Sequence, residues 1–292
     1  MAQVSPLDFF KQSLKSDAYY ADEIINIYLL RPLAAVIVWI LFPTRVTPNQ
    51  VTSFAILVGF AAAYTYTLNT ASAFAIAGLL VIAKDVLDDA DGQLARAKGM
   101  YSRRGRFLDS IGDFIVDIAI FTAITLRVYQ NQPGAGTIAL GFLSLMGITL
   151  RVSYHVFYQV SFLHLEERYK LNRIAEEITG EDRKGDAVAL RLQQVFLLIY
   201  GWQDRLMYRI DRWCRGPAKA GNDEQLSAWY SDRFGLRISG LLGFGTEFVL
   251  LAVCSVFNQL YLYLLLNVFL MNGIWLLSVF YRRILRAKNI AQ

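Results

Sequence analysis

The residues best suited to chemistry are seven aspartates in an otherwise apolar part of the chain: Asp85, Asp88, Asp89, Asp91, Asp109, Asp113 and Asp117. Asp88 and Asp91 are three residues apart, and Asp109 and Asp113 are four apart. On helices, each of these two pairs lies on one face. Two neighbouring helices joined by a short loop can therefore direct four carboxylates at one point.

Four clustered carboxylates repel one another and take up protons unless cations lie among them. Residues 84–117 contain neither cysteine nor histidine, so only oxygen ligands converge. Oxygen ligands suit Mg²⁺ or Mn²⁺ rather than zinc. Because protein-bound Mg²⁺ commonly completes its shell with phosphate oxygens, the pattern predicts a phosphorylated substrate.

Small and basic residues accompany the aspartates. Gly92 and Ala95 fall on or near the face of Asp88 and Asp91, where they leave room for a ligand. Arg96 follows within one helical turn and is placed to reach a phosphate or a carboxylate. Gly105 begins the next helix, and the segment 103–106 (RRGR) offers positive charge to an anionic substrate.

The composition indicates an integral membrane protein. Of the 292 residues, 55% are hydrophobic and 18% are charged, whereas soluble domains average about 45–50% and about 25%. The net charge of +5 comes from basic residues that flank apolar runs, which favours a membrane surface over nucleic acid as the partner. Cys214 and Cys254 have no metal-ligand spacing, and the amino terminus does not resemble a cleavable signal peptide.

The apolar runs predict an all-α membrane protein with six spans, at about 49–68, 73 into the acidic segment, 107–126, 137–160, 238–257 and 261–281. The shorter run Ile27–Thr44 is expected to form a helix in the membrane interface. The predicted organisation is an N-terminal interfacial segment (1–45), four spans with the aspartates (46–162), a cytoplasmic amphipathic helical insertion (163–235), and two spans with a basic tail (236–292).

The distribution of basic residues predicts the orientation. Among basic residues, the loops after the first, third and fifth spans contain only Arg127. The opposite side contains the basic residues of the 103–106 segment, the 163–237 stretch and the tail. By the positive-inside rule, both termini and the aspartates face the cytoplasm. We expect the membrane to be a bacterial inner membrane.

The acidic segment also resembles a known family. The pattern Asp88-x2-Asp91-Gly92-x2-Ala95-Arg96-x8-Gly105-x3-Asp109-x3-Asp113 matches the signature of the CDP-alcohol phosphotransferase (CDP-alcohol phosphatidyltransferase) family at every fixed position. The stretch 29–52, with an interfacial helix followed by Thr47, Pro48 and Asn49, and the six-span topology are also similar to the family. The resemblance covers residues 24–160 by motif or topology and the last two spans by topology alone. The resemblance does not extend to residues 163–235.

The resemblance implies a reaction. An alcohol hydroxyl attacks the β-phosphate of a CDP-linked donor, and CMP leaves. By position, Asp88, Asp91, Asp109 and Asp113 would hold two Mg²⁺ or Mn²⁺ ions, and Asp113 would be the general base. The residues implied to bind the CDP moiety are Asn49, Gly92, Ala95, Arg96 and Gly105. A homodimer is implied as well.

Several other residues allow two readings each. Arg151, inside the fourth predicted span, either binds an acceptor phosphate or is structural, as a partner of Asp117 or a side chain that extends to the cytoplasmic interface. His155 on its face is a second acceptor-site candidate. Glu247 is a contact between helices or part of the cavity, and Lys84 is expected to be structural. Asp117 pairs with Lys84 or lines the cavity, and Asp89 is expected at an exposed or ion-paired position. Trp202, Trp213 and Trp229 are expected to anchor the insertion at the interface.

The predicted function is the transfer of a phosphatidyl group from CDP-diacylglycerol to a polar or polyol alcohol in phospholipid synthesis. One alternative is a soluble CDP-choline- or CDP-ethanolamine-like donor acting on a lipid alcohol. An alternative of another class is a divalent-cation transporter, but this function predicts carboxylates spread over several spans and does not need Gly92, Ala95 or Gly105. An inactive scaffold is a third possibility and requires that no metal binds.

Overall fold

The computed structural model describes residues 20–165, 176–216 and 223–290, and within these ranges every element is helical and no strand occurs, which confirms the all-α prediction. The elements are η1 (Asn26–Leu30), α2 (Arg31–Leu41), α3 (Pro48–Thr67), α4 (Ala71–Lys98), α5 (Arg103–Asn131), α6 (Ala135–Leu165), α7 (Gly180–Lys184), α8 (Ala187–Arg215), α9 (Asp223–Tyr230), α10 (Arg233–Ser239), η2 (Gly240–Leu242), α11 (Phe244–Val256), α12 (Leu260–Leu265), η3 (Leu266–Met271) and α13 (Asn272–Ile290). Parts of the predicted interfacial segment, insertion and tail lie outside the described residues.

A tight turn places α4 and α5 side by side. Helix α4 ends at Lys98, and the next residue, Gly99, has a φ of 64°, a left-handed conformation that suits glycine. Helix α5 begins after Ser102, whose hydroxyl accepts a hydrogen bond from the N–H of Gly105 at 3.2 Å. Because only four residues separate the helices, the aspartates near the end of α4 face those near the start of α5.

Close packing holds α3 against these two helices. Helix α3 packs along both α4 and α5, and α4 packs against α11 on another side. A Cβ atom at Gly59 would collide with the side chain of Val116, so α3 and α5 approach closely at this level. Small residues at such crossings allow the van der Waals contact that stabilises helix pairs in lipid.

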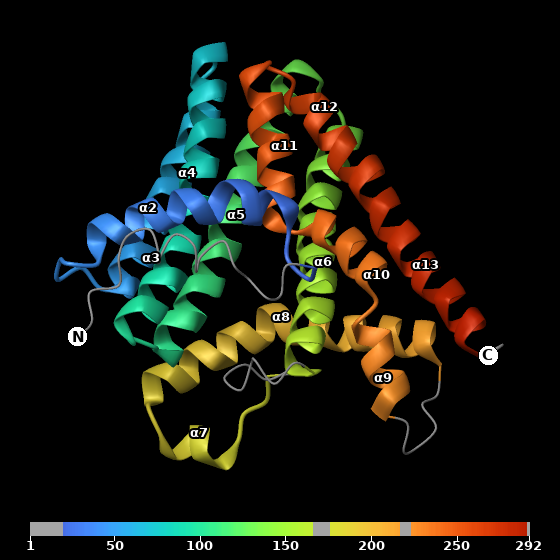
Figure 1. The fold of residues 1–292 in the computed structure, drawn as a ribbon. Coiled ribbons are helices and arrows are strands. Elements are labelled where there is room, and N and C mark those ends of the chain that lie inside the picture. The colour runs from blue at the N-terminus through green and yellow to red at the C-terminus, as the bar shows by residue number, and fades with distance from the viewer. Residues whose placement is uncertain (1–19, 166–175, 217–222, 291–292) are drawn as a thin grey trace.

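Two helices run across the long helices instead of along them (Figure 1). Helix α2 packs on α4, where Ala34 and Val38 join a buried cluster with Val86, Ala90 and Leu94. Helix α8 packs against α5, α6 and α13. The α4–α5 pair therefore has one crossing helix on its α4 side and another on its α5 side.

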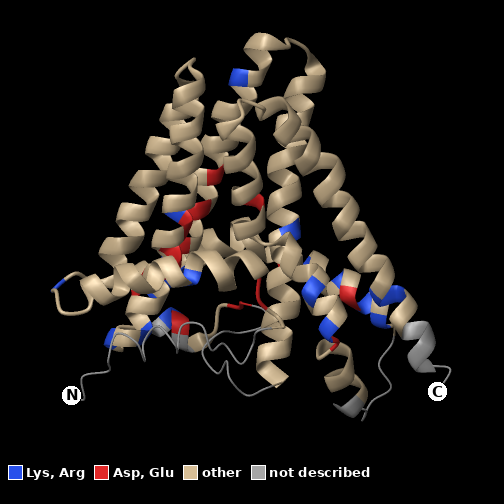
Figure 2. Ribbon diagram, turned by 45° about the horizontal axis from the view of Figure 1, so that its top comes forward, with Lys and Arg blue, Asp and Glu red and all other residues tan. Residues whose placement is uncertain are grey.

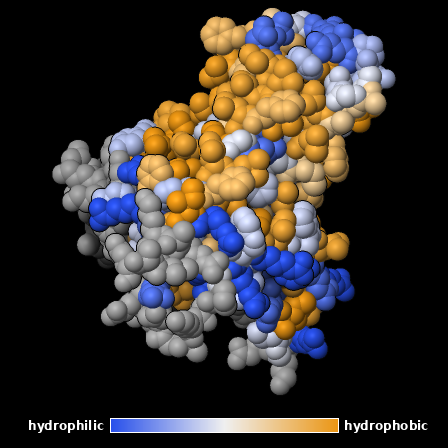
Figure 3. Space-filling model, turned by 90° about the vertical axis from the view of Figure 1, so that its right-hand side faces the viewer, coloured by the Kyte–Doolittle hydropathy of each residue, from blue (hydrophilic) through white to orange (hydrophobic). Residues whose placement is uncertain are grey.

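Charge and hydropathy are distributed as a membrane protein requires. Lys and Arg gather toward the end of the bundle where α7 and α8 lie, while the acidic residues of the middle lie on α4 and α5 (Figure 2). The face in Figure 3 shows a broad hydrophobic zone between two more hydrophilic ends. This distribution agrees with a protein embedded in a bilayer.

By length and composition, Ala135–Leu165 and Leu260–Leu285 are able to cross a membrane. The pair Arg233–Leu242 and Phe244–Val256, bent by 43°, adds a third span if it counts as one. The predicted total of six spans therefore stays a prediction, as does the interfacial position of Asn26–Leu41.

The bend before α11 is explained by a residue far away in the sequence. Glu23 is buried, and its carboxylate accepts a hydrogen bond from the N–H of Thr246 at 3.3 Å, in the first turn of α11. A Cβ atom at Gly243 or Gly245 would overlap this carboxylate. Burial, the largest effect, raises the pKa of Glu23 well above its usual range, and the charge of Asp85 adds to the shift.

Candidate metal and active site

Three signature carboxylates converge between α4 and α5. Asp88 and Asp91 on α4 and Asp109 on α5 each offer an oxygen atom, and these atoms all lie within 4.8 Å of one another. We call these three residues the carboxylate trio. The predicted convergence of acidic residues from two neighbouring helices is thus present for three of the four aspartates.

The trio fits a divalent cation. Asp88 Oδ1 and Asp109 Oδ1 are buried without a hydrogen-bond partner among the described residues. Leaving a buried carboxylate oxygen unpaired is costly, and a bound cation removes that cost. Because all the ligand atoms are oxygens, Mg²⁺ or Mn²⁺ is favoured over zinc. The predicted pair of ions stays a prediction.

A hydroxyl group from α3 orients one member of the trio. Thr52 is buried, and its Oγ1 donates a hydrogen bond to Asp91 Oδ2. Partners of this kind fix the rotamer of a metal ligand and are part of a metal site's design. Helix α3 therefore contributes to the site although none of its residues belongs to the trio.

The fourth signature aspartate has a different neighbour. Asp113 Oδ1 lies 2.6 Å from the Nζ atom of Lys84, and the same ammonium group forms an ion pair with Asp88 Oδ2. Lys84 is buried on α4, one turn before Asp88. Asp113 as a metal ligand and as the general base stays a prediction.

Two residues predicted to bind the CDP moiety touch each other. A Cβ atom at Gly105 would collide with Asn49 Oδ1, so the amide of Asn49 lies directly against the backbone of α5. At Gly92, by contrast, a Cβ atom would meet only the guanidinium group of Arg96, at 3.5 Å. Ala95 is half-buried and Arg96 is exposed. The predicted residues thus lie around the end of the α4–α5 pair where the two helices are joined.

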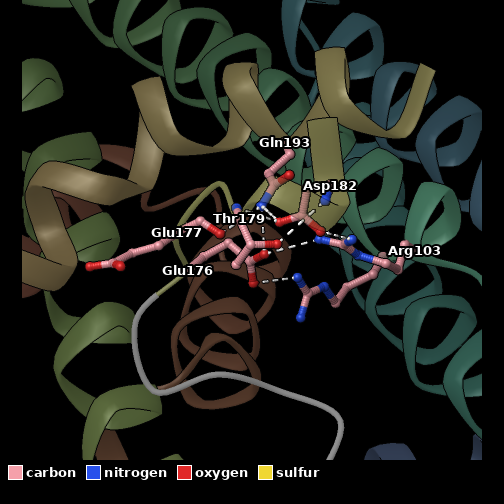
Figure 4. Close-up of polar contacts among 7 residues, drawn as sticks. Arg103, Glu176, Glu177, Thr179, Asp182 and Gln193 are labelled. Carbon is pink, nitrogen blue, oxygen red and sulfur yellow. Dashed lines mark hydrogen bonds and ion pairs between the residues drawn. The ribbon is translucent and has the colours of Figure 1, made fainter. Parts of the chain in front are cut away.

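A network of ion pairs covers the arginines at the start of α5. Figure 4 shows Arg103 directed at Asp182 and Glu176, with Gln193 beside them. Arg106 pairs with Glu176 at 2.6 Å, and Arg104 pairs with Asp186. The hydrogen bond from Arg103 holds the pKa of the Asp182 carboxyl well below its usual range, so this group is ionised at neutral pH. We call residues 176–186 the acidic strap.

A cavity lies between the strap, α8 and the start of α5. It has a volume of about 240 Å³, and its lining includes Ser102, Arg103, Arg104, Asp186 and Gln193. It therefore adjoins the Arg103–Arg106 segment that the sequence suggests for an anionic substrate.

Comparison with known proteins identifies the family. The family model described as CDP-alcohol phosphatidyltransferase matches residues 45–207, which is more than half of the chain. The chain belongs to this family. The matched region contains the trio, Asp113, Lys84 and the strap. The resemblance noted in the sequence is therefore confirmed, and the CDP-alcohol phosphatidyltransferase family uses divalent metal ions.

Curated relatives share part of this region. The chain is 32% identical over 158 residues to the bifunctional IPC transferase and DIPP synthase of Archaeoglobus fulgidus, covering 53% of this chain and 27% of the relative. It is 38% identical over 110 residues to the protein of the same name from Thermococcus kodakarensis, covering 38% and 24%. It is 38% identical over 81 residues to the archaetidylinositol phosphate synthase of Pyrococcus horikoshii, covering 28% and 42%. The chain thus spans about a quarter of the bifunctional relatives' length and less than half of the synthase.

The predicted acceptor residues lie in a buried polar network. Arg151 is fully buried, and it donates hydrogen bonds to Glu247 at 2.7 Å, to Asn272 at 2.6 Å and to the carbonyl of Asn267 at 3.0 Å. His155 is buried, and its Nδ1 has no hydrogen-bond partner among the described residues. Glu247 makes a polar contact between helices, which was one of its two readings, and its place in the cavity stays a prediction. A role for Arg151 or His155 in acceptor binding stays a prediction.

Other aspartates and the tryptophans differ in their environments. Asp117 is buried near Lys84, and Asp89 is half-buried with a hydrogen bond to Asn26. Trp202 and Trp213 are exposed, as interfacial anchors require. The prediction for Trp229 is wrong: the side chain is buried, and its Nε1 donates a hydrogen bond to Asp211 at 2.9 Å.

Sequence reasoning missed Tyr200. Its hydroxyl donates a hydrogen bond to the carbonyl of Ser110 at 2.8 Å, and its ring packs against Phe114. Burial raises the pKa of Tyr200, and the charges of Asp117 and Asp113 add to the shift, so the hydroxyl lies near the aspartates. The available signal was the spacing of Phe196 and Tyr200 on one face of an amphipathic helix.

Proposed function

We propose that the protein transfers the phosphatidyl group of CDP-diacylglycerol to the hydroxyl group of a polar or polyol alcohol and releases CMP. Membership of the CDP-alcohol phosphatidyltransferase family supports transfer from a CDP-linked donor. The observation that carries the proposal is the carboxylate trio between α4 and α5, with Asp113 one turn beyond Asp109.

The chain's own residues have distinct roles in this reaction. Asp88, Asp91 and Asp109 would hold the divalent cation that neutralises the diphosphate charge, and the predicted number of ions is two. Asn49, Gly92, Ala95, Arg96 and Gly105 would line the CDP site. Asp113 would accept the proton of the acceptor hydroxyl. The new bond joins the acceptor oxygen to the β-phosphorus, and the bond from that phosphorus to the bridging oxygen breaks, so that oxygen leaves with CMP.

The relatives favour a polyol acceptor. One of them is named an archaetidylinositol phosphate synthase, which supports inositol or a phosphorylated inositol among the alcohols to be tried. A phosphorylated acceptor would need a cationic partner, for which Arg151 and His155 are the predicted residues. The alternative donor is a soluble CDP-alcohol acting on a lipid alcohol.

The membrane arrangement is part of the proposal. Helices α3, α4 and α5 would cross the bilayer together with α6, the α10–α11 pair and the α12–α13 segment, for six spans in total. The basic residues near α7 and α8 support a cytoplasmic active site and the insertion at 163–235. The four-part division, a bacterial inner membrane and a homodimer stay predictions.

CMP release tests the proposal. Purified protein with Mg²⁺ and CDP-diacylglycerol is incubated with a panel of alcohols that includes inositol and inositol phosphate. We expect CMP and a new phosphodiester lipid with the wild type, and at least a 100-fold lower rate with Asp113→Asn. If no CDP-linked donor reacts while the protein moves Mn²⁺ into liposomes, the transporter is the better description.

A further inference from the structure

Helix α8 is fixed to the bundle along one of its faces. Tyr200 donates a hydrogen bond to the carbonyl of Ser110 on α5 at 2.8 Å, and Gln203 accepts one from the hydroxyl of Ser153 on α6 at 2.5 Å. The helix also packs against α13. We call the opposite face, which consists of the exposed side chains of α8, the outer face.

The outer face carries positive charge without compensating anions. Four arginines of this face are exposed and form no ion pair or side-chain hydrogen bond with the described residues: Arg191, Arg205, Arg209 and Arg212. Neither acidic residue of α8 is exposed, because Asp211 is buried and Asp204 is half-buried. Arg103, Arg104 and Arg106, by contrast, each pair with a carboxylate of the strap. The outer face is therefore suited to an anionic partner.

Large apolar side chains share the outer face with these arginines. Leu198 is 79% exposed, Trp202 is 41% exposed and Trp213 is 53% exposed. Arginine on the polar side and tryptophan and leucine on the apolar side are typical of helices that lie in the membrane interface. A nucleic acid would pair with the arginines but would leave the apolar side chains in water, whereas a phospholipid surface covers both.

The contacts of Trp213 place α8 beside lipid-facing surface. The carbonyl of Trp213 accepts a hydrogen bond from Arg283, whose guanidinium group lies 4.6 Å from the centre of the Trp213 ring. Arg283 is close to the end of Leu260–Leu285, which is long and apolar enough to cross a membrane. At the same level, Phe280 and Ile284 are 56% and 59% exposed, as side chains that face lipid are. The outer face of α8 therefore continues this apolar surface at its border with water.

We propose that the outer face of α8 is a binding surface for the headgroups of anionic phospholipids. The arginines would contact the phosphate groups, while Leu198, Trp202 and Trp213 lie among the upper parts of the acyl chains. A zwitterionic headgroup carries its own positive charge and is attracted less strongly. The proposal goes beyond anchoring by tryptophan, because an anchor does not distinguish between headgroups, and it does not depend on the proposed reaction.

Photo-crosslinking tests the proposal without any turnover. Purified full-length protein is placed in phosphatidylcholine nanodiscs with a trace of phosphatidylglycerol or phosphatidylcholine that carries a diazirine high on one acyl chain. Mass spectrometry then measures the crosslinks to peptides from Ala187–Arg215. We expect about fivefold more crosslinks from the phosphatidylglycerol probe, and a ratio near one in about 0.5 M NaCl. Equal crosslinking by the two probes at low salt overturns the proposal.

Charge variants of the outer face provide the matched controls. The combined variant Arg205→Gln, Arg209→Gln and Arg212→Gln should bring the ratio to within about twofold of one, because three of the four charges are lost. The corresponding triple lysine variant keeps the charges and should keep the ratio. So should Arg183→Gln, which removes an exposed charge on α7. A triple glutamine variant that keeps the wild-type ratio contradicts the proposal, and if this variant does not fold, the wild-type ratio and its salt dependence decide.

A spin label at position 198 distinguishes lipid from water or protein around the outer face. Leu198→Cys is labelled with a nitroxide, since Cys214 and Cys254 are buried. We expect oxygen, which partitions into lipid, to relax this label more than a water-soluble nickel chelate does, and the reverse for Arg183→Cys. A label at 198 that responds mainly to nickel shows that the face is in water. A label protected from both reagents shows that a protein covers it, and either result contradicts the proposal.

Discussion

At the scale of single residues, the site depends on groups that orient the carboxylates as much as on the carboxylates themselves. The Thr52 hydroxyl donates a hydrogen bond to Asp91 and also contacts the carbonyl of Pro48 at 3.2 Å. Since Pro48 is in the first turn of α3, the beginning of this helix and the rotamer of a metal ligand are coupled.

Thr52→Val should therefore lower activity without unfolding the protein. Valine keeps the shape of threonine but cannot donate the hydrogen bond to Asp91, and the loss of such a partner costs roughly 10–100-fold in metal affinity or activity. The measurement is the rate of CMP release as a function of Mg²⁺ concentration. Thr52→Ser is the matched control and should retain most activity. Equal rates for the valine variant and the wild type would show that Asp91 needs no such partner.

Arg151 and Glu247 should be coupled in stability. Because both are buried, Arg151→Met alone leaves the Glu247 charge without its cation and should destabilise the protein by about 3–5 kcal/mol. Adding Glu247→Gln removes the second charge and keeps an acceptor for Tyr263 and Asn267, so stability should largely recover. Thermal unfolding in detergent measures both effects. Additive losses in the double variant would contradict the coupling.

The contacts that the sequence predicted correctly are those between residues close together in the sequence. The spacing of Asp88 and Asp91 on one helix predicts a shared face, and the short α4–α5 turn brings Asp109 to it. The Arg151–Glu247 pair was not predictable, because its members are 96 residues apart in sequence and their contact depends on how α6 packs against α11. The ion pairs of Lys84 with Asp88 and Asp113 were not predictable either, because the length of its side chain allows several partners and only the packing of α4 against its neighbours selects among them.

At the scale of elements, the strap and α8 cover one side of the α4–α5 pair. Glu176 contacts both Arg103 and Arg106, and Gln193 of α8 donates hydrogen bonds to Glu176 and Asp182. The arginine side chains of these pairs are 32–48% exposed, whereas the carboxylates of Glu176 and Asp182 are buried. The strap therefore holds positive charges that remain open to solvent and for which an anionic donor can compete.

Glu176→Gln should lower the KM for the CDP-linked donor by about threefold, because Arg103 and Arg106 lose an anionic partner and attract the diphosphate more strongly. Glu177→Gln is the matched control: it makes the same charge change one residue away, and Figure 4 shows the Glu177 carboxylate directed away from both arginines. Steady-state kinetics at low and high salt measure the effect, which should shrink at high salt. Equal changes in both variants would indicate a general charge effect.

Asp204 on α8 should make the stability of this region depend on pH. Burial raises the pKa of Asp204 to about 6, and the nearby Glu176 charge contributes. Because the folded pKa exceeds the unfolded value, the stabilising contribution is complete below about pH 4 and is lost as pH rises through 6. Asp204→Asn should therefore raise stability by roughly 1 kcal/mol at pH 8 and leave it nearly unchanged at pH 4. Thermal unfolding at the two pH values checks this, and a larger gain at pH 4 would contradict it.

The helices themselves were largely predictable. The predicted span 49–68 corresponds to α3 (Pro48–Thr67), and 137–160 lies within α6 (Ala135–Leu165). The predicted span 238–257 is interrupted at Gly243, because the carboxylate of Glu23 occupies the space beside that glycine. Hydropathy could not reveal this break, since its cause is a residue more than 200 positions earlier.

At the scale of the whole molecule, the turns after α3, α5 and α11 should face away from the cytoplasm. Cysteines at Ser72 and Gln132, both exposed positions, should react with a membrane-impermeant maleimide in intact cells. A cysteine at Met100, which is 45% exposed, should react only after permeabilisation. Cys214 and Cys254 are buried and should give little background. The reverse labelling pattern would mean that the carboxylates open to the outer side.

The two crossing helices have a consequence for how substrates arrive. With α2 against α4 and α8 against α5, the carboxylates are flanked on both sides by helices lying roughly parallel to the expected bilayer plane. Acyl chains of a lipid substrate would then remain in the hydrocarbon while its headgroup reaches the cation, and a water-soluble alcohol would approach from the solvent beneath the strap. Such a layout lets two reactants of opposite solubility meet without either one leaving its own phase.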